Sequence, residues 1–124
     1  MKVVTLQQAE TVHFSVEGFT SHRFLTASDS LGFTICKTVI PKGLCQVWHY
    51  TNHLEACYCV SGKAIVENIA TGEVFTISPD VVYALDAHDR HKFTAITDVV
   101  LISVFNPPLV GTETHKEDGS YGIS

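Results

Sequence analysis

The succession of short strand-like segments constrains the fold of this chain more than any other feature of its sequence. Between residues 31 and 105, segments rich in β-branched residues alternate with turns of glycine, proline and aspartate, roughly every ten residues. No long stretch of helical periodicity interrupts them. This spacing is typical of a β-sandwich or β-barrel, with strands predicted at residues 31–40, 45–50, 55–60, 64–69, 73–77, 81–85, 91–97 and 99–105.

The two ends of the chain carry weaker signals. Residues 2–6 predict a short apolar strand, and residues 11–30 predict one strand followed by a long loop. Residues 111–124 are polar and contain three glycines, so their composition alone would predict a frayed terminus. We therefore expect a single domain over residues 1–124, in which residues 110–124 form a C-terminal tail.

The stretch from Gly43 to Gly62 contains the clearest candidate site. His49 follows Gly43 by six residues, Glu55 follows His49 by six, and Gly62 follows Glu55 by seven. Side chains alternate between the two faces of a strand, so Glu55 shares a face with two cysteines further along. A carboxylate on the inner face of a small barrel needs a proton, a partner or a metal, because burying it bare is too costly.

Charge and composition argue against several classes of function. The net charge of −5 is unlike that of a nucleic-acid-binding protein, which presents a basic surface. No apolar run reaches the ~18 residues of a membrane span, and residues 1–10 lack the regions of a signal peptide. The four cysteines form no CxxC pair, so a sulfur-only zinc site is not predicted. Reduced thiols in a cytoplasmic protein are the simplest interpretation.

Longer segments resemble known families. The spacing between residues 43 and 62 resembles the first cupin signature, G-x5-H-x-H-x3-E-x6-G, with Thr51 at the second histidine position. Three segments are similar to ectoine synthases: HYTNHLEACYCVSG, VVYALDAHDRHKF and VFNPPLVGTETHKEDGSY. The opening MKVVTLQQA also fits, so the resemblance covers nearly the whole chain. The last two of the three segments are the more specific, because a bare cupin signature is shared by many functions.

The resemblance implies an all-β cupin, a jelly-roll type β-barrel that forms a single domain. It also implies a cytoplasmic hydro-lyase that cyclises N-γ-acetyl-L-2,4-diaminobutyrate to ectoine, a compatible solute linked to osmotic stress, with loss of water. The partners implied are this small-molecule substrate, a second copy of the chain in a homodimer, and one Fe(II) ion or another divalent metal. Neither nucleic acid nor membrane is expected as a partner.

Carried over by position, the resemblance assigns three sets of residues. The metal ligands would be Glu55, Tyr83 and His91, and their oxygen and nitrogen donors suit Fe(II) better than a thiolate site would. A tyrosine ligand requires the metal charge to lower its pKa. The substrate contacts would come from Phe19, Arg23, Cys36, Thr38 and Phe105, and the catalytic residues would be Tyr50, Glu113 and His115.

Several alternatives remain at this point. His49 occupies the usual cupin ligand position, so a set of His49, Glu55 and His91 competes with the set that contains Tyr83. Phe19, Cys36 and Ser103 differ from residues common in the family. They favour a related cyclase or lyase that acts on another amino-acid derivative. A non-catalytic cupin that binds a small acid is the other alternative. Arg23 suits a substrate carboxylate through its planar fork, although a surface ion pair would also explain it.

The C-terminal tail suggests a separate hypothesis, which concerns closure of the site. Pro107 and Pro108 stiffen the exit from the last predicted strand, and Glu113 and His115 lie two residues apart. In an extended segment both side chains would face the same side, toward the barrel mouth, where histidine can relay a proton near neutral pH. We hypothesise that residues 110–124 close over bound substrate as a lid.

Overall fold

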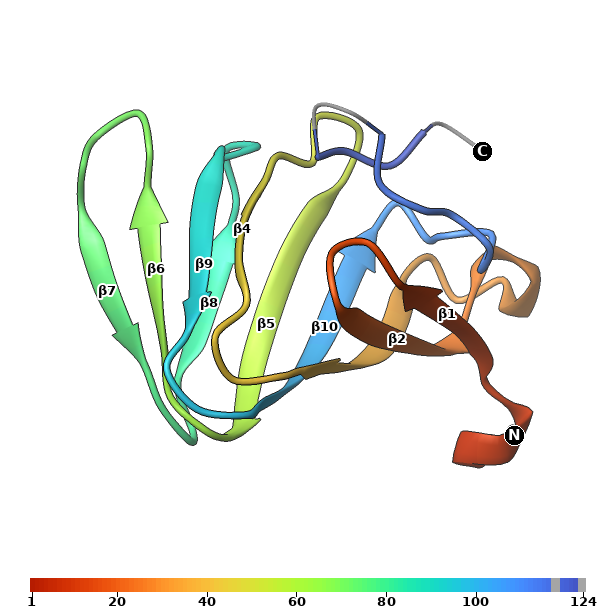
Figure 1. Ribbon diagram of the computed structural model, residues 1–124. Helices are drawn as coiled ribbons and strands as arrows, with labels where there is room; N and C mark the ends of the chain where they lie inside the picture. The colour runs from red at the N-terminus through yellow and green to blue at the C-terminus, as the bar shows by residue number, and fades with distance from the viewer. Residues whose placement is uncertain (117–118, 123–124) are drawn as a thin grey trace.

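Two antiparallel β-sheets face each other in the computed structural model, which describes residues 1–116 and 119–122 (Figure 1). One sheet has the strand order β1-β2-β3-β10-β5-β8, and the other has the order β4-β9-β6-β7. The elements are η1 (Leu6–Gln8), β1 (Glu10–Phe14), β2 (Phe19–Leu25), η2 (Ala27–Asp29), β3 (Thr34–Ile40), β4 (Cys45–Trp48), β5 (Leu54–Ser61), β6 (Ala64–Asn68), β7 (Val74–Ile77), β8 (Val82–Leu85), β9 (His91–Ala95) and β10 (Val99–Asn106). The predicted β-barrel class is therefore confirmed.

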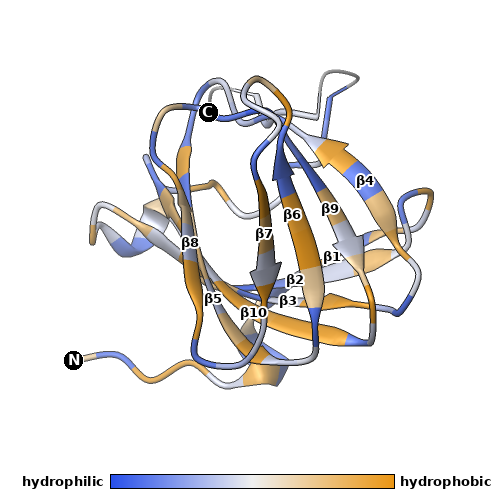
Figure 2. Cartoon of the chain, turned by 90° about the vertical axis from the view of Figure 1, so that its left-hand side faces the viewer, coloured by the Kyte–Doolittle hydropathy of each residue, from blue (hydrophilic) through white to orange (hydrophobic). Residues whose placement is uncertain are grey.

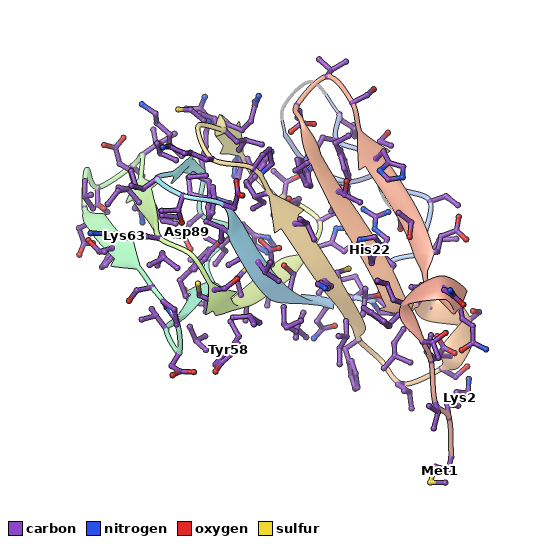
Figure 3. The ribbon with its side chains drawn as sticks, turned by 60° about the horizontal axis from the view of Figure 1, so that its bottom comes forward. Met1, Lys2, His22, Tyr58, Lys63 and Asp89 are labelled. Carbon is purple, nitrogen blue, oxygen red and sulfur yellow. The ribbon has the colours of Figure 1, made fainter. Side chains whose placement is uncertain are left out.

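Strand β5 shows how the sequence pattern sets the inner and outer faces. Glu55, Cys57 and Cys59 are buried, whereas Tyr58 and Val60 are 40% and 47% exposed. Tyr58 lies on the outside of the sheet in Figure 3. This period of two is the alternation expected for a strand with one face toward a core. It places the Glu55 carboxylate inside the barrel, as the sequence predicted.

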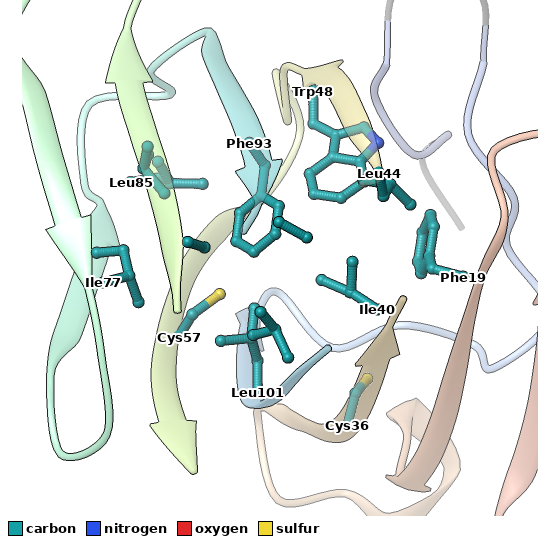
Figure 4. Packing of buried hydrophobic residues seen from close by; sticks show 14 of the residues in the cluster. Phe19, Cys36, Ile40, Leu44, Trp48, Cys57, Ile77, Leu85, Phe93 and Leu101 are labelled. Carbon is teal, nitrogen blue, oxygen red and sulfur yellow. The ribbon is translucent and has the colours of Figure 1, made fainter. Parts of the chain in front are cut away.

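The hydrophobic core fills the space between the two sheets. Phe93, Ile40 and Leu101 are almost fully buried there, and Trp48 and Phe19 belong to the same buried cluster (Figure 4). Hydrophobic segments follow the strands, and many of the connecting loops are polar (Figure 2). Within the described residues, no helix has the length and hydropathy needed to cross a membrane.

Gly62, the last residue of the signature spacing, has a structural reason to be glycine. Its φ of +91° is rarely adopted by L side chains. A Cβ at this position would lie 2.0 Å from the Asp98 carbonyl oxygen and 2.8 Å from the Val99 Cα. The turn between β5 and β6 therefore packs directly on the backbone that leads into β10.

Two expectations for the N-terminal region were wrong. Residues 2–6 form no strand, because residues 2–5 lead into η1, which begins at Leu6. The Thr5 backbone N–H donates to the Gln8 side chain at 2.9 Å. Residues 11–30 contain most of a β-hairpin, β1 paired with β2, followed by η2. Gly18, at a φ of +93°, allows this reversal, and its N–H donates to the Phe14 carbonyl at 2.6 Å.

The described part of the tail packs against the barrel, so a frayed terminus is not what the structure shows for residues 110–116 and 119–122. Figure 1 shows the tail, in dark blue, running from β10 past β1 and β2 to the loop between β4 and β5. The His49 N–H donates to the Gly119 carbonyl at 3.2 Å, and the Asn52 amide donates to the Tyr121 carbonyl at 2.9 Å. Leu109 and Tyr121 are buried, at 0% and 2% exposed.

Candidate functional site

A small cavity lies at the end of the barrel that the tail covers. Its free volume is about 20 Å³, roughly enough for one water molecule. Tyr50 and Tyr121 pack with ring centroids 5.0 Å apart, and each also contacts the Phe105 ring. The lining residues are Phe19, Ser21, Thr38, Ile40, Trp48, Tyr50, Glu55, Cys57, Tyr83, Leu101, Ser103, Phe105 and Tyr121. A bound substrate therefore requires these aromatic side chains and the tail to move.

Glu55 is the buried acid of this cavity. Its side chain points inward from β5, and the residue is only 9% exposed. Burial raises the pKa of Glu55 to about 7, and hydrogen bonds from Cys57 and Ser103 offset only part of that rise. A carboxylate in this position gains from any cation that binds beside it.

His91 presents an unpartnered nitrogen inside the protein. The residue begins β9, and its Nδ1–H donates to the Asp89 carbonyl at 3.0 Å. This hydrogen bond leaves Nε2 as the ring atom with the free lone pair. Nε2 is buried and has no hydrogen-bond partner, and burial lowers the pKa of His91, which keeps the ring neutral. A neutral, oriented imidazole with one bare nitrogen is the form that binds a metal.

Tyr83 connects the surroundings of Glu55 and His91. It lines the central cavity together with Glu55, and it also lines a second cavity of about 70 Å³ together with His91. In the sheet it lies opposite Cys57, two residues from Glu55 along β5. Burial raises the pKa of Tyr83 well above its ordinary value, and the neighbouring Cys57 and Glu55 add to the rise. Without a cation its phenol therefore keeps its proton.

Glu55, Tyr83 and His91 carry donor atoms that suit a divalent metal, and their coordination of one stays a prediction. The fit depends on the bare Nε2 of His91, the buried carboxyl of Glu55 and the phenol of Tyr83, since a cation would lower the pKa of both acids. Among residues 1–116 and 119–122, no three His, Cys, Asp or Glu side chains come together as a metal site would require. Besides burial, the charge of His49 contributes to the lowered pKa of His91, so the choice between Tyr83 and His49 as the third ligand stays a prediction.

A row of inward-facing residues crosses the six-stranded sheet from Tyr83 to Arg23. Register pairs Tyr83 with Cys57, Cys57 with Ser103, Ser103 with Cys36, and Cys36 with Arg23. Five neighbouring strands, β8, β5, β10, β3 and β2, each contribute one side chain. The row therefore joins the predicted metal end of the site to the predicted substrate-binding arginine.

Arg23 holds the tail in this structure. Its Nη1 donates to the carbonyls of Gly111 and Glu113 at 3.2 and 2.7 Å, and its Nη2 donates to the Tyr121 hydroxyl at 3.2 Å. Its Nε donates to Ser21 at 3.1 Å, and the residue is 1% exposed. The alternative of a surface ion pair is wrong because Arg23 is buried. A role toward the substrate carboxylate stays a prediction.

The two catalytic candidates of the tail have different partners. His115 Nε2 lies 2.7 Å from the Tyr50 hydroxyl. The Glu113 carboxylate accepts hydrogen bonds from the N–H groups of Val110 and Gly111, at 2.6 and 2.8 Å, and lies 3.9 Å from Arg23. His115 is thus placed to exchange a proton with Tyr50, while Glu113 fixes the bend of the tail.

The predicted substrate contacts divide into two groups. Phe19, Thr38 and Phe105 line the cavity, and the Thr38 and Ser103 hydroxyls lie 3.1 Å apart. Cys36 is fully buried next to Arg23, and burial raises the pKa of its thiol to about 12, so it acts as a neutral packing group.

Tyr121, Trp48 and Glu17 also take part in the site, although no sequence pattern assigned them to it. Tyr121 lies in the quoted tail motif, and Trp48 is the only tryptophan and immediately precedes the signature histidine, so both left a signal. No feature of the sequence distinguishes Glu17, because it is one acid in a polar turn.

The chain is similar over its whole length to proteins of one known family. The sequence profile of ectoine synthases matches residues 1–124. The chain belongs to the ectoine synthase family. An L-ectoine synthase of Desulfosudis oleivorans is 49% identical over 108 residues, which is 86% of this chain and 84% of the relative. Membership confirms both the resemblance and the prediction of an enzyme.

Similarity to solved structures supports membership in this family. The crystal structure of ectoine synthase from P. lautus has a TM-score of 0.83 and 34% identity, and the match covers 90% of this chain and 81% of that one. An RmlC-like cupin from Shewanella frigidimarina has a TM-score of 0.68 at 18% identity, over 86% and 92% of the two chains. The second likeness concerns the fold alone, which is that of a cupin.

Proposed function

We propose that this ectoine synthase family member cyclises N-γ-acetyl-L-2,4-diaminobutyrate to ectoine with loss of water, at a mononuclear metal site. The observation that carries the proposal is the bare, buried Nε2 of His91, which shares Tyr83 as a neighbour with the buried carboxyl of Glu55. Family membership supplies the substrate class, and the three donors supply a reason for a metal.

The reaction requires proton transfers that balance within the active site. The α-nitrogen forms a bond to the amide carbonyl carbon, and the carbon–oxygen bond breaks. Two of the three protons of the ammonium group leave with that oxygen as water, and the third stays on the amidinium product. The enzyme therefore needs a group that takes a proton from nitrogen and later returns it to oxygen.

Glu55, Tyr83 and His91 would hold the metal, with Fe(II) proposed and other divalent ions possible. When bound, the metal supplies Lewis-acid polarisation of the amide carbonyl. The hydrogen bond from His91 Nδ1 to Asp89 fixes the ring so that Nε2 faces inward.

Tyr50 and His115 are the proposed proton carriers. Tyr50 lines the cavity, and its hydroxyl contacts His115 Nε2 at 2.7 Å. Burial raises the pKa of Tyr50 well above its ordinary value, so the phenol is protonated at rest and acts as a donor. Phe19 and Phe105 wall the cavity and exclude water, which favours a dehydration.

We also propose a homodimer in the cytoplasm, where the product would serve as a compatible solute under osmotic stress. The outer face of the six-stranded sheet supports the dimer, because it exposes the apolar side chains of Val39, Tyr58, Val60, Val82 and Val104. A second copy would cover such a surface. Sedimentation equilibrium should give twice the chain mass, and a monomer at micromolar concentration would exclude this part of the proposal.

The activity is tested with iron-loaded protein, prepared without oxygen and followed by ¹H NMR. N-γ-acetyl-L-2,4-diaminobutyrate should disappear as ectoine forms. Glu55→Gln should abolish turnover, whereas the matched variant Glu73→Gln, which alters an exposed acid, should retain it. Turnover of a glutamine-like analogue alone would favour the related cyclase, and binding without turnover would favour the non-catalytic alternative.

A further inference from the structure

Glu17 connects the turn in which it lies to two other parts of the chain. It lies in the turn between β1 and β2, and its two carboxylate oxygens lie 2.9 and 3.0 Å from His115 Nδ1 in the tail. The Trp48 indole N–H, from the end of β4, donates to the same carboxylate at 2.7 Å. Glu17 therefore joins the hairpin, the opposite sheet and the tail through charge-assisted hydrogen bonds.

We propose that Glu17 is the positioning residue of a carboxylate–imidazole–phenol relay, Glu17–His115–Tyr50, which carries the proton of the cyclisation. The proposal rests on the proposed function and adds a residue that acts through His115. It also gives Trp48 a role, since the indole N–H holds the carboxylate in place.

The hydrogen bonds define one direction of proton transfer. The His115 Nδ1–H donates to the Glu17 carboxylate, which leaves Nε2 as the acceptor for the Tyr50 O–H at 2.7 Å. Burial raises the pKa of Glu17, but the hydrogen bonds from His115 and Trp48 outweigh it, so the pKa is lowered overall and the carboxylate stays charged. A charged carboxylate stabilises the imidazolium that forms when Nε2 accepts a proton.

The relay spans the wall of the protein. Its inner end, Tyr50, lines the central cavity, and its outer end, Glu17, lines a surface depression together with Phe14, Val16 and His115. His115 itself is shielded, with 3% of its side chain exposed. A proton can therefore pass between substrate and imidazole without direct contact between the cavity and bulk water.

The relay also links chemistry to the position of the tail. His115 is contributed by the tail, whereas Tyr50 and Glu17 belong to the barrel, so the three groups meet only when the tail lies against it. His115 stacks on Tyr121 at 4.7 Å and 14°, which fixes the ring plane. The titratable groups that face His115 are Glu17, Tyr50, Tyr121 and, through charge alone, His91.

The test compares Glu17→Gln with Glu73→Gln, which removes an equal charge from an exposed turn. Glutamine keeps the length of the side chain and one acceptor oxygen, but it cannot stabilise an imidazolium. We expect kcat to fall at least about tenfold, with KM changed less than about twofold, and Glu17→Asp to recover part of the loss. An unchanged kcat, or a raised KM with normal kcat, would reduce Glu17 to a contact that only holds the tail.

A second measurement does not depend on turnover. In the ¹⁵N NMR spectrum of the wild-type protein, neutral His115 should carry its proton on Nδ1. In Glu17→Gln that preference for Nδ1 should weaken, because the charged acceptor has been removed. A proton on Nε2 in the wild type, or the same tautomer preference in Glu17→Gln, overturns the relay. Absence of cyclisation by the wild type would instead refute the proposed function.

Discussion

Replacing Glu55 by glutamine should remove a pH dependence from the stability of the metal-free protein. The carboxyl has a pKa of about 7 in the folded chain, against an ordinary value of 4.5, because it is buried. A difference of about 2.5 pH units corresponds to about 3 kcal/mol between the protonated and charged forms. This is a large share of the stability of a small domain.

The sign follows from where the proton binds more tightly. Between pH 4.5 and about 7 the folded chain retains the Glu55 proton that the unfolded chain has lost. Its contribution to the free energy of unfolding is therefore complete below pH 4.5, decreases as pH rises through this window, and is lost above about pH 7. Burial lowers the pKa values of His53 and His91, which act in the opposite direction, so the comparison must be made between variants.

The assay is urea unfolding of chelator-treated protein at several pH values from 5 to 8. The difference in unfolding free energy between Glu55→Gln and wild type should grow by about 3 kcal/mol in favour of the variant across that range, while Glu73→Gln should show no such trend. Adding Fe(II) should reverse the trend for the wild type alone, because a metal binds the deprotonated ligands. Parallel curves for the wild type and Glu55→Gln would refute the buried-acid interpretation.

Three further predictions follow from the backbone and the tail. Gly62→Ala should lower the free energy of unfolding by more than about 3 kcal/mol, because its Cβ would meet the Asp98 carbonyl at 2.0 Å. Gly72→Ala has open space around it and should cost only about 1–2 kcal/mol, from its positive φ. Equal losses for the two variants in urea unfolding would contradict this. A chain that ends at Leu109 should stay folded and keep its metal but lose turnover, since it lacks His115 and Tyr121; a near-normal kcat would return the tail to a passive role. Arg23→Ala should raise KM at least about tenfold with metal content intact. It should also speed trypsin cleavage at the exposed Lys116, because Arg23 holds the tail carbonyls. An unchanged KM and an unchanged cleavage rate would exclude both roles.

The sequence predicted those parts of the fold that depend on local chemistry. Eight strands from β3 to β10 were placed because turns such as Pro41-Lys42-Gly43 interrupt segments of period two. The inward position of Glu55 followed from the same period. The β1–β2 hairpin was not predicted because its outer side chains are polar. Its reversal depends on one glycine, Gly18, and no alternation of apolar and polar residues marks that position.

The site could be predicted only as far as the family motifs reach. Motif positions predicted His91 and Tyr83 as ligands, but no motif shows that Nε2 of His91 lacks a hydrogen-bond partner, because that depends on the packing of both sheets. The contacts of Arg23 and Glu17 with the tail join residues roughly ninety or more positions apart. Such long-range contacts leave no spacing in a single sequence, so they required the structure.

Anomalous scattering at the iron edge, from crystals of protein loaded with Fe(II), tests the central claim most directly. We predict one strong peak per chain, bound by the Glu55 carboxylate, the Tyr83 phenol oxygen and His91 Nε2. The Asp89 carbonyl should still accept the His91 Nδ1–H. A peak bound by His49 in place of Tyr83, or no peak near Glu55, would contradict it.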